Sequence, residues 1–445
     1  METSSLAQPF LEWAGALPQG VTFIIGPPGT GKTSELVRLA NPRSILITFN
    51  VAAAREAAER GAVASTIHSL AVRLAVRMGY SLPGNGGNAD IAIMRIRAAA
   101  AKRHGYRFSM NPFYEEKGNI LFREFDKAIN TRGSDWLAAI PPRHRAPLIE
   151  YVEYLERFNY VDFTTALLKA TGAVAEYSAP LLLVDEAQDL SPLMWGLIPS
   201  MFINVERLVI AGDDDQTLYA SMHGADPSIL ARLTSIADTV TLQESHRVPR
   251  RVQEFAERVI APTRLVPKKW SPRNEEGEVR LISRGLIDEA VKAVGRGAGS
   301  VFILTRTNAV ALKVIRAFLA RGLLVNTIKK PEPYILRAAR QVLREGRAEV
   351  VGKVNAKVVQ LFLQAVSERR REEVITGAAS LPVAVDTVHA SKGLEADAVF
   401  IINAVDKLPR RLRVDEERRL IYVAATRARR ELIIYSPAWG ARWFT

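Results

Sequence analysis

The sequence predicts an α/β fold of two tandem domains, each a doubly wound parallel sheet with a helical insertion. Three observations lead to this prediction. Short apolar runs with strand character alternate with helical patterns, which is typical of βα units in a parallel sheet. The alternation forms two series, one in each half of the chain. The 445 residues provide enough chain for about three domains with large cores.

The first series is expected to fold residues 1–69 and 180–250 into one sheet domain. Residues 70–179 interrupt it with a mostly helical pattern that is rich in aromatic side chains and contains an NGGN loop at Asn85–Asn88. We therefore expect these residues to form a helical insertion. The strands expected in the sheet are Val21–Ile25, Ser44–Phe49, Leu181–Val184, Leu208–Ile210 and Thr239–Leu242.

The second series is expected to fold residues 251–445 into another sheet domain. Residues Arg337–Glu373 have a helical, arginine-rich pattern, which predicts a short helical insertion near 335–375. Residues Ala261–Asn274 contain three prolines and are expected to form a linker or surface loop. The strands expected in this sheet are Val279–Ile282, Val301–Leu304, Leu323–Thr327, Val383–Val388, Ala398–Asn403 and Glu431–Tyr435.

The net charge of +13 is distributed unevenly along the chain. Residues 1–250 contain 24 Lys and Arg against 26 Asp and Glu, whereas residues 251–445 contain 36 against 21. An excess of positive charge in one half attracts polyanions, nucleic acid first. An arginine-rich thermostable surface is the alternative explanation. The acidic residues of the first half gather in LVDEAQD and AGDDDQ, where metal and water chemistry would need them.

The composition also excludes several classes of protein. The chain has no cysteine, which excludes disulfides, thiolate metal sites and a cysteine nucleophile. No apolar run approaches the ~20 residues of a membrane span. The first residues lack the basic and then apolar pattern of a signal sequence. We therefore expect a cytoplasmic protein without a membrane partner.

The most informative segment is VTFIIGPPGTGKT, an apolar strand-like run followed directly by the pattern G-x-x-x-x-G-K-T. The glycines of this pattern let the backbone curl, so that its N–H groups and the next helix N-terminus face phosphate oxygens. We expect Lys32 to bridge the β- and γ-phosphates and the Thr33 hydroxyl to hold Mg²⁺. A chance turn rich in glycine and proline is the alternative. The residues expected around the nucleoside triphosphate are Gly26, Pro27, Pro28, Gly29, Thr30, Gly31, Lys32, Thr33 and Ser34.

Two later strand ends are expected to add the catalytic acids and a sensor of the γ-phosphate. In LLLVDEAQD, four apolar residues predict a buried strand whose carboxylates emerge beside the phosphate loop. Asp185 is expected to bind Mg²⁺ through water, and Glu186 to orient and deprotonate the attacking water. In LVIAGDDDQTLYA, Gln216 is expected to contact the γ-phosphate, and an ordinary polar loop is the alternative.

With these motifs, the chain resembles the superfamily 1 DNA helicases of the UvrD/Rep/PcrA type. The resemblance extends from about Thr22 to Leu432 and keeps the family's order of eight elements. VDEAQD and GDDDQTLY match the family's motifs almost perfectly. The other matching segments are TFNVAAAREAAER, STIHSL, LQESHR, TRTNA, VDTVHASKGLEADAVFI and EERRLIYVAATRARREL. The resemblance implies two RecA-like sheet domains that use ATP and Mg²⁺.

The resemblance also implies roles for single residues. Arg247 and Arg427 would act as arginine fingers on the γ-phosphate, across a cleft between the domains. Glu395 would hydrogen-bond the ribose or help to close that cleft, and His246 stands where a tyrosine usually stacks on adenine. For the histidines of the groove a core or capping role is the alternative, and for Phe49 plain core packing. The residues implied along the strand-binding groove are Thr48, Phe49, Asn50, His68, Tyr219, Met222, His223, Thr387 and His389.

Several positions depart from the family's pattern. Ala220, Ser221 and Met222 follow Tyr219 where the family has an aromatic residue, and Ala396 stands where tryptophan is common. These changes weaken the expected base stacking, whereas the triphosphate site is unaffected. Only 59 residues separate Thr327 from Thr387, so the accessory domain of the large members is tiny here or replaced by a short helical pair. The insertion at 70–179 could carry the wedge that separates a duplex.

The sequence therefore predicts an ATP-dependent DNA helicase that moves 3′→5′ on single-stranded DNA and unwinds duplex DNA as a monomer. Its partners would be single-stranded DNA and duplex-junction DNA, and RNA stays open because phosphate contacts do not distinguish the two. One alternative is a single-strand translocase that removes bound proteins without separating duplexes. The other is a nucleic-acid-binding protein that is gated by nucleotide.

Overall fold

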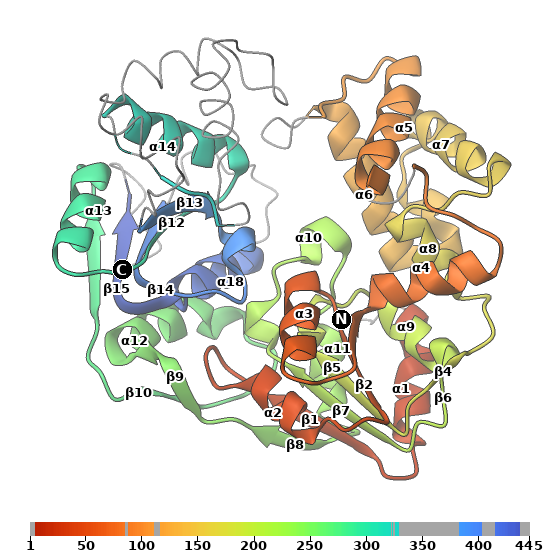
Figure 1. Ribbon diagram of the computed structural model, residues 1–445, viewed down its shortest axis with the longest axis horizontal. Coiled ribbons are helices and arrows are strands. Elements are labelled where there is room, and N and C mark those ends of the chain that lie inside the picture. Colours follow the sequence, from red (N-terminus) through yellow and green to blue (C-terminus); the bar gives the residue numbers. More distant parts are fainter. Residues whose placement is uncertain are drawn as a thin grey trace. The chain divides into compact units, whose positions relative to one another are not determined.

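The computed structural model describes residues 5–84, 88–110, 116–321, 323, 325–328, 382–402 and 414–436. They divide into two compact units (Figure 1). The first unit contains described residues of 5–246 and 263–271, and the second contains 247–262 and described residues from 272 onward. The chain therefore enters the second unit, returns to the first for nine residues, and leaves it again.

The first unit is built on a six-stranded sheet in the order β3-β2-β5-β7-β1-β8. All of its neighbouring strands are parallel, as the βα alternation predicts. The five strands expected here are confirmed within two residues at each end, and only the three-residue edge strand β3 was not predicted. The strands are β1 (Val21–Ile25), β2 (Ser44–Thr48), β3 (Ala64–Thr66), β5 (Leu181–Asp185), β7 (Arg207–Gly212) and β8 (Asp238–Thr241).

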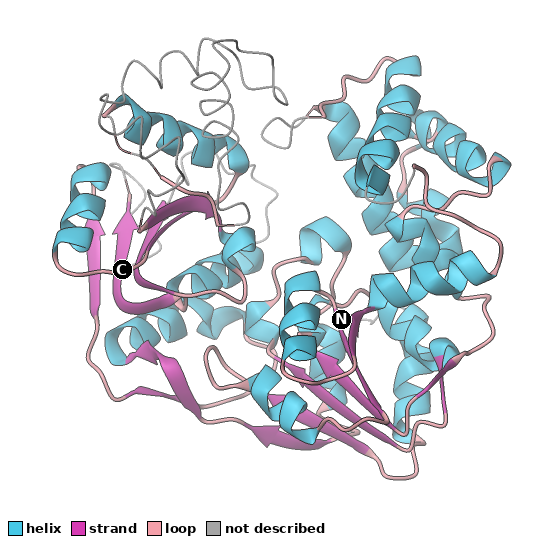
Figure 2. Cartoon of the chain, in the orientation of Figure 1, coloured by secondary structure: helices cyan, strands magenta, loops and turns pink. Residues whose placement is uncertain are grey.

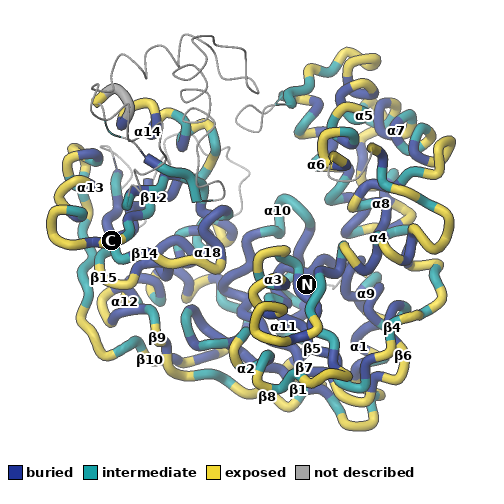
Figure 3. Tube along the Cα trace, viewed as in Figure 1, coloured by how far each residue is buried: buried dark blue, intermediate teal, exposed yellow. Residues whose placement is uncertain are grey.

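Helices cover both faces of this sheet, because successive strand residues point to opposite sides. Phe23 of β1 packs in the larger core, which also contains residues of α1 (Gln8–Gly15) and α9 (Pro192–Met201). Its neighbour Ile24 packs in a second core with residues of α2 (Lys32–Leu39) and α3 (Val51–Glu59). Figure 3 shows the buried residues concentrated along the central strands. The sheet is therefore doubly wound, as predicted.

Among the described residues, five α-helices lie in the part of the chain where the sequence predicts a helical insertion, and Figure 2 shows this part to be mainly helical. It begins at Ile67, three residues before the predicted start, and its first helix is capped by the Thr66 side chain. Its core is aromatic, with the Phe125 and Tyr151 rings 5.9 Å apart, and it is continuous with the larger core of the sheet. The helices are α4 (Ile67–Arg77), α5 (Ala89–Arg103), α6 (Lys117–Arg132), α7 (Ala146–Arg157) and α8 (Phe163–Ala170).

The second unit contains a five-stranded parallel sheet in the order β11-β15-β14-β12-β13. Helices α13 (Leu286–Gly295) and α14 (Asn308–Ala320) pack on one face. Helices α12 (Arg250–Ile260) and α18 (Val414–Ala425) contact each other and lie on the opposite face (Figure 1). The strands are β11 (Glu278–Ile282), β12 (Val301–Thr305), β13 (Val383–Thr387), β14 (Ala396–Ile402) and β15 (Ala428–Tyr435).

Two segments expected in the second half of the chain are not described as regular elements. In the stretch expected as a strand at Leu323–Thr327, the described residues form only an isolated bridge from Asn326 to Ala384. The predicted helical pattern at Arg337–Glu373 and the insertion near 335–375 lie outside the described residues.

The segment expected as a linker or surface loop, Ala261–Asn274, is not a surface loop. Its residues 263–271 belong to the first unit, where Val266, Lys268 and Trp270 are buried. After Gly212, the chain also forms α10 (Ala220–His223), α11 (Ser228–Leu233) and β9 (Glu244–Pro249), and β9 pairs with β10 (Ser271–Arg273). The minor strands β4 (Tyr177–Ser178) and β6 (Phe202–Ile203) pair with each other.

Candidate functional site

The phosphate-loop pattern lies between β1 and α2, as its sequence requires. Gly29 and Gly31 have φ angles of 75° and 85°, in the left-handed region that side chains rarely adopt. The Lys32 ammonium donates a 2.6 Å hydrogen bond to the carbonyl oxygen of Gly26, and a Cβ on Gly26 would lie 1.9 Å from Lys32 Cγ. The loop therefore folds closely around its lysine, and only glycine fits at position 26.

The phosphate loop is also held by the first residues of β9. The Ser245 hydroxyl donates to the carbonyl of Pro28 at 2.7 Å, and the His246 N–H donates to that of Gly29 at 3.0 Å. Within the loop, the Thr30 hydroxyl donates to the carbonyl of Pro27 at 2.8 Å. The backbone of His246 is therefore hydrogen-bonded to the loop, while its imidazole is exposed. The predicted stacking of this imidazole on adenine stays a prediction.

The end of β5 brings a buried carboxylate to the first turn of α2. Asp185 Oδ2 accepts a 2.7 Å hydrogen bond from the Thr33 hydroxyl, and its Oδ1 accepts from the Glu186 N–H. Burial, together with the nearby charge of Glu186, raises the pKa of Asp185 to about 6. A hydroxyl and a carboxylate oxygen are donors that Mg²⁺ prefers. The residues present therefore fit the predicted cation.

Glu186 has an unusual backbone conformation for a glutamate. Its φ of 51° lies in the left-handed region, which costs energy for a residue with a side chain and is often found at functional sites. Its Oε2 accepts a 2.7 Å hydrogen bond from the Gln188 amide. The same Gln188 side chain accepts from the Asp213 N–H through its Oε1 at 3.0 Å. Gln188, which the sequence analysis did not identify, thus connects the ends of β5 and β7.

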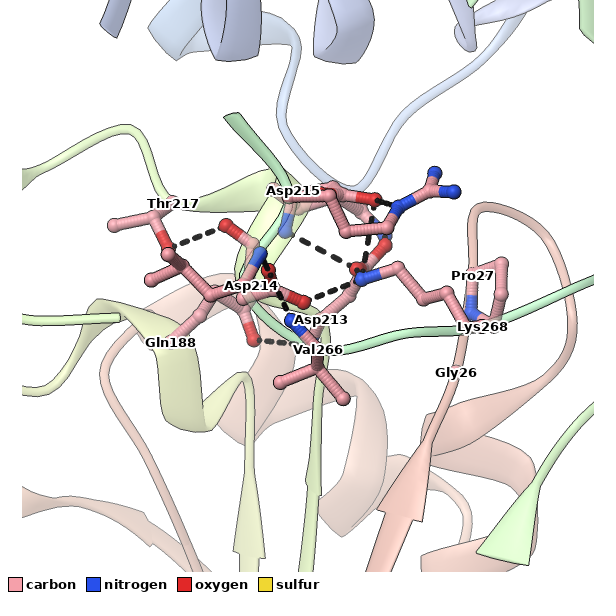
Figure 4. Close-up of polar contacts among 12 residues, drawn as sticks. Gly26, Pro27, Gln188, Asp213, Asp214, Asp215, Thr217, Val266 and Lys268 are labelled. Atoms are coloured by element: carbon pink, nitrogen blue, oxygen red, sulfur yellow. Dashed lines mark hydrogen bonds and ion pairs between the residues drawn. The ribbon is translucent and has the colours of Figure 1, made fainter. Parts of the chain in front are cut away.

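The three aspartates that follow β7 are all buried, with one oxygen of each within 4.8 Å of the others. Lys268 lies among them (Figure 4). Its Nζ is 2.5 Å from Asp213 Oδ1 and 3.1 Å from Asp215 Oδ2, and it also pairs with Asp214. Asp215 is paired in addition with Arg264 at 2.8 Å. We call these five residues, Asp213, Asp214, Asp215, Arg264 and Lys268, the aspartate–lysine cluster.

For this cluster, the expectation that AGDDDQ supplies carboxylates to metal and water chemistry stays a prediction. The cations of the protein itself already occupy the position between the carboxylates. The cluster also orients the side chain of Gln216, because Gln216 Nε2 donates to Asp213 Oδ2 at 2.8 Å. Its predicted contact with the γ-phosphate stays a prediction.

Four of the predicted groove residues of the first unit form one aromatic group. The Phe49 ring lies 5.0 Å from Tyr219, 5.5 Å from His68 and 5.8 Å from His223, between centroids. Burial lowers the pKa of His68 to about 4, with a smaller contribution from His223, and burial also lowers the pKa of His223. Both imidazoles are therefore neutral at neutral pH. The group comes from the end of β2, the start of α4 and α10 with the residue before it.

The other three predicted groove residues of this unit differ in their surroundings. Thr48 is fully buried, and its hydroxyl has no hydrogen-bond partner among the described residues. The Asn50 side chain caps α3 by accepting from the Ala52 N–H at 2.9 Å, which gives it a structural role. Met222 is half-buried in α10.

The predicted residues of the second unit lie within β9 or close to the ends of β13 and β14. Arg247 Nε is 2.6 Å from Glu395 Oε2, and Arg429 approaches the other oxygen of Glu395 at 3.3 Å. Thr387 ends β13, and His389 lies in the short helical turn Val388–Ser391 that follows. Glu395, expected at the ribose, is therefore a partner of Arg247 in this structure.

The side chain of Arg427, predicted to act as an arginine finger, is buried and hydrogen-bonded to backbone carbonyls. The residue is only 2% exposed, and its Nε donates to the Val423 carbonyl at 3.0 Å. Its Nη1 donates to the Leu394 carbonyl at 3.3 Å. The guanidinium thus attaches the loop before β14 to α18. Nothing in the sequence indicated that Arg427 would make these structural contacts in addition to the predicted contact with phosphate.

Comparison with known proteins gives matches in both halves of the chain. The family described as "UvrD-like helicase C-terminal domain" matches residues 356–437, and the family described as "AAA domain" matches residues 12–222. The chain is 25% identical to the ATP-dependent DNA helicase UvrD2 of Mycobacterium tuberculosis, over 94% of this chain and 76% of that protein. It is 26% identical to the ATP-dependent DNA helicase PcrA of Leuconostoc citreum, over 58% of this chain and 40% of that protein.

Among solved structures, an alignment with the PRRSV helicase covers 97% of this chain and 54% of that chain, at 12% identity and a TM-score of 0.39. The Arterivirus nonstructural protein 10 helicase gives the same TM-score and identity over 64% of its chain. The chain thus spans between half and two thirds of the length of these viral proteins. Among the described residues, no helix combines the length and apolar composition needed to cross a membrane.

Proposed function

Because the chain belongs to the superfamily 1 helicases of the UvrD/PcrA type, we propose that it moves 3′→5′ along single-stranded DNA at the expense of ATP and unwinds duplex DNA. The observation that carries the ATP-dependent part is the 2.7 Å contact between Thr33 of the phosphate loop and Asp185 at the end of β5. It joins the two motifs that the chemistry needs, which lie 152 residues apart in sequence.

On the nucleotide side, each residue has a distinct task. The Lys32 ammonium would exchange the Gly26 carbonyl for β- and γ-phosphate oxygens, which are stronger acceptors because they are charged. Thr33 and Asp185 would hold Mg²⁺, which supplies charge neutralisation to the phosphates when bound. Glu186 would accept the proton of the attacking water, and Gln216 would contact the γ-phosphate. Arg247 and Arg427 would add positive charge to the transition state, with His246 at the adenine and Glu395 near the ribose.

On the DNA side, the aromatic group around Phe49 is the proposed stacking platform. Each base that stacks on such a ring contributes ~1–3 kcal/mol. Thr48, Asn50 and Met222 of the first unit, and Thr387 and His389 of the second, would complete the path of the strand. Single-stranded and duplex-junction DNA are the proposed partners, the monomer is the proposed active form, and the cytoplasm is the proposed location.

We also propose the domain organisation predicted from the sequence. Residues 1–69 and 180–250 would form the first RecA-like domain, 70–179 a helical insertion that carries the wedge, and 251–445 the second RecA-like domain. The nine-residue return of segment 263–271 to the first unit modifies this division.

A translocase that does not separate strands is the second candidate, and one observation favours it. Ala396, where the family often has tryptophan, is fully buried and opens β14 paired with Ala428. It therefore provides no ring for a base. The loss of this contact weakens the grip on DNA without changing ATP hydrolysis.

The two candidates differ in strand displacement. Duplexes with a 3′ or a 5′ single-stranded tail are incubated with the protein, with and without ATP, and the released strand is measured. We expect ATP-dependent release from the 3′-tailed duplex only. Release from the 5′-tailed duplex alone contradicts the proposed polarity. Hydrolysis that single strands stimulate, without release from either substrate, supports the translocase, and no stimulated hydrolysis contradicts both.

A further inference from the structure

Lys268 is a buried lysine whose ammonium lies against three aspartates. Its side chain is fully buried, as are the side chains of Asp213 and Asp215. Its ammonium donates hydrogen bonds to Asp213 and Asp214 and forms an ion pair with Asp215. The negative charge of the three carboxylates, which outweighs the effect of burial, raises the pKa of Lys268. The ammonium is therefore permanently charged.

The charge of Lys268 in turn determines the state of Asp213. Three carboxylates within 4.8 Å of one another repel, and without a cation between them at least one would take up a proton. The pKa of Asp215 is already raised to about 7, mainly by burial and by Asp213. Burial favours the neutral form of Asp213, but the charges of Lys268 and Lys32 and the hydrogen bonds from Lys268 and Gln216 together outweigh it, so the pKa of Asp213 is lowered. Lys268 thus keeps Asp213 ionised.

An ionised Asp213 fixes the orientation of Gln216. A carboxylate can only accept hydrogen bonds, so Gln216 must turn its NH₂ group toward Asp213 Oδ2, where the contact is 2.8 Å. Its carbonyl oxygen is then directed away from Asp213. Asp213 Oδ1 meanwhile accepts from Lys268 Nζ at 2.5 Å. A protonated or displaced Asp213 would permit the opposite amide orientation.

The main chain around Lys268 is held by the same cluster. The N–H groups of Leu265 and Val266 donate to Asp214 Oδ2 at 2.7 and 3.2 Å (Figure 4). Asp213 also reaches the other strand end, because its own N–H donates to the side chain of Gln188, which donates to Glu186. A continuous set of hydrogen bonds therefore runs from Lys268 to both Gln216 and Glu186.

We infer that Lys268 is a positioning residue for nucleotide hydrolysis, which holds Asp213 so that the carbonyl oxygen of Gln216 is left to accept a hydrogen bond from the attacking water. This inference rests on the proposed function, since it assigns Gln216 to the hydrolysis reaction. Lys268 itself touches no reacting atom. Because Lys268 acts through Asp213, its replacement should change kcat and leave the affinity for the nucleotide unchanged.

The next residue, Lys269, provides a matched control, because it has the same side chain but is exposed. Steady-state ATP hydrolysis is measured for the wild type, Lys268→Met, Lys269→Met, Gln216→Ala and the double variant Lys268→Met/Gln216→Ala. Thermal unfolding of each variant checks that it is folded. We expect Lys268→Met to lower kcat by ~10²-fold, the scale of a misplaced catalytic group, with KM for ATP nearly unchanged. Lys269→Met should match the wild type.

The double variant is the decisive arm. If Lys268 acts through Gln216, the double variant hydrolyses ATP as slowly as Gln216→Ala alone, because the two effects do not add. The inference is overturned if the losses in kcat of the two single variants multiply in the double variant. It is also overturned if Lys268→Met has the kcat of the wild type. If Lys268→Met does not fold, the same cycle is run with Lys268→Arg, which keeps the charge and changes the geometry. A wild type without ATP hydrolysis contradicts the proposed function instead.

Discussion

Two neighbouring strands of the first unit both end in buried acidic residues, yet the two ends have different surroundings. β5 and β7 are hydrogen-bonded side by side, and Asp185 is the last residue of β5 while Asp213 directly follows β7. At the end of β7, Lys268 lies between the carboxylates, 55 residues from Asp213 in sequence. At the end of β5, Asp185 accepts hydrogen bonds from the Thr33 hydroxyl and the Glu186 N–H.

This difference explains the opposite pKa directions of Asp185 and Asp213. Burial raises the pKa of Asp185 to about 6, because its surroundings do not neutralise it fully. The ammonium of Lys268 lowers the pKa of Asp213 in an equally buried position. The end of β5 is thus suited to receive a cation from solution, whereas the end of β7 contains one as part of the fold. An acidic motif after a strand does not by itself distinguish the two cases.

The largest effect should come from the end of β5, where the proposed catalytic base Glu186 lies. Changing Glu186→Gln removes the proposed base but keeps the shape, so kcat should fall by ~10²–10⁴-fold while ATP still binds. Asp214→Asn makes the same acid-to-amide change at the other strand end and should affect turnover far less. Steady-state hydrolysis and binding of a fluorescent ATP analogue measure the two quantities. Near wild-type turnover of Glu186→Gln would show that the base is another residue.

A smaller effect should separate the strand ends by their response to Mg²⁺. Asp185→Asn weakens the proposed cation site, so half-maximal hydrolysis should need ~10–100-fold more Mg²⁺, the usual scale for a group that holds a metal through water. Asp213→Asn should lower kcat through Gln216 without changing this concentration. Hydrolysis is measured in a Mg²⁺ titration of both variants. Equal Mg²⁺ requirements for the two would remove the distinction between the strand ends.

The smallest effect concerns the pH dependence of stability. The pKa of Asp215 is about 7 in the folded protein, against 3.8 for a free aspartate. Between these values the folded protein holds a proton that the unfolded chain releases, so the free energy of unfolding falls as the pH rises toward 7. Asp215→Asn should therefore reduce this loss by about 2–3 kcal/mol between pH 5 and 8, since about two pH units of that range lie below the folded pKa at ~1.4 kcal/mol each. Urea denaturation across that range measures it, and an unchanged slope would contradict the raised pKa.

The sheets and the triphosphate loop could be predicted because their signals are local. Val21–Ile25 was predicted with its exact bounds, since an apolar run and the glycine pattern after it act on adjacent residues. Three-residue β3 was missed because so short a run has no period to detect. The aromatic group around Phe49 required the resemblance, since its members come from three separate elements.

Lys268 could not be predicted, because its burial depends on partners that precede it by more than 50 residues. In sequence, KKW between prolines is typical of an exposed loop. A buried lysine becomes stable only where several carboxylates surround it, and that requires the folded sheet. The structural contacts of Arg427 were missed for the same reason, since its acceptors are backbone carbonyls.

The return of segment 263–271 to the first unit has a consequence for how the protein is made. Domains usually fold as units while the chain emerges from the ribosome. Here the first sheet is complete once β8 has been synthesised, but three buried carboxylates lack their lysine until residue 268 follows. A polypeptide that stops at residue 250 would therefore contain the whole sheet and the phosphate loop and still be poorly stable. The first unit must wait for residues that the ribosome adds only after it has begun the second.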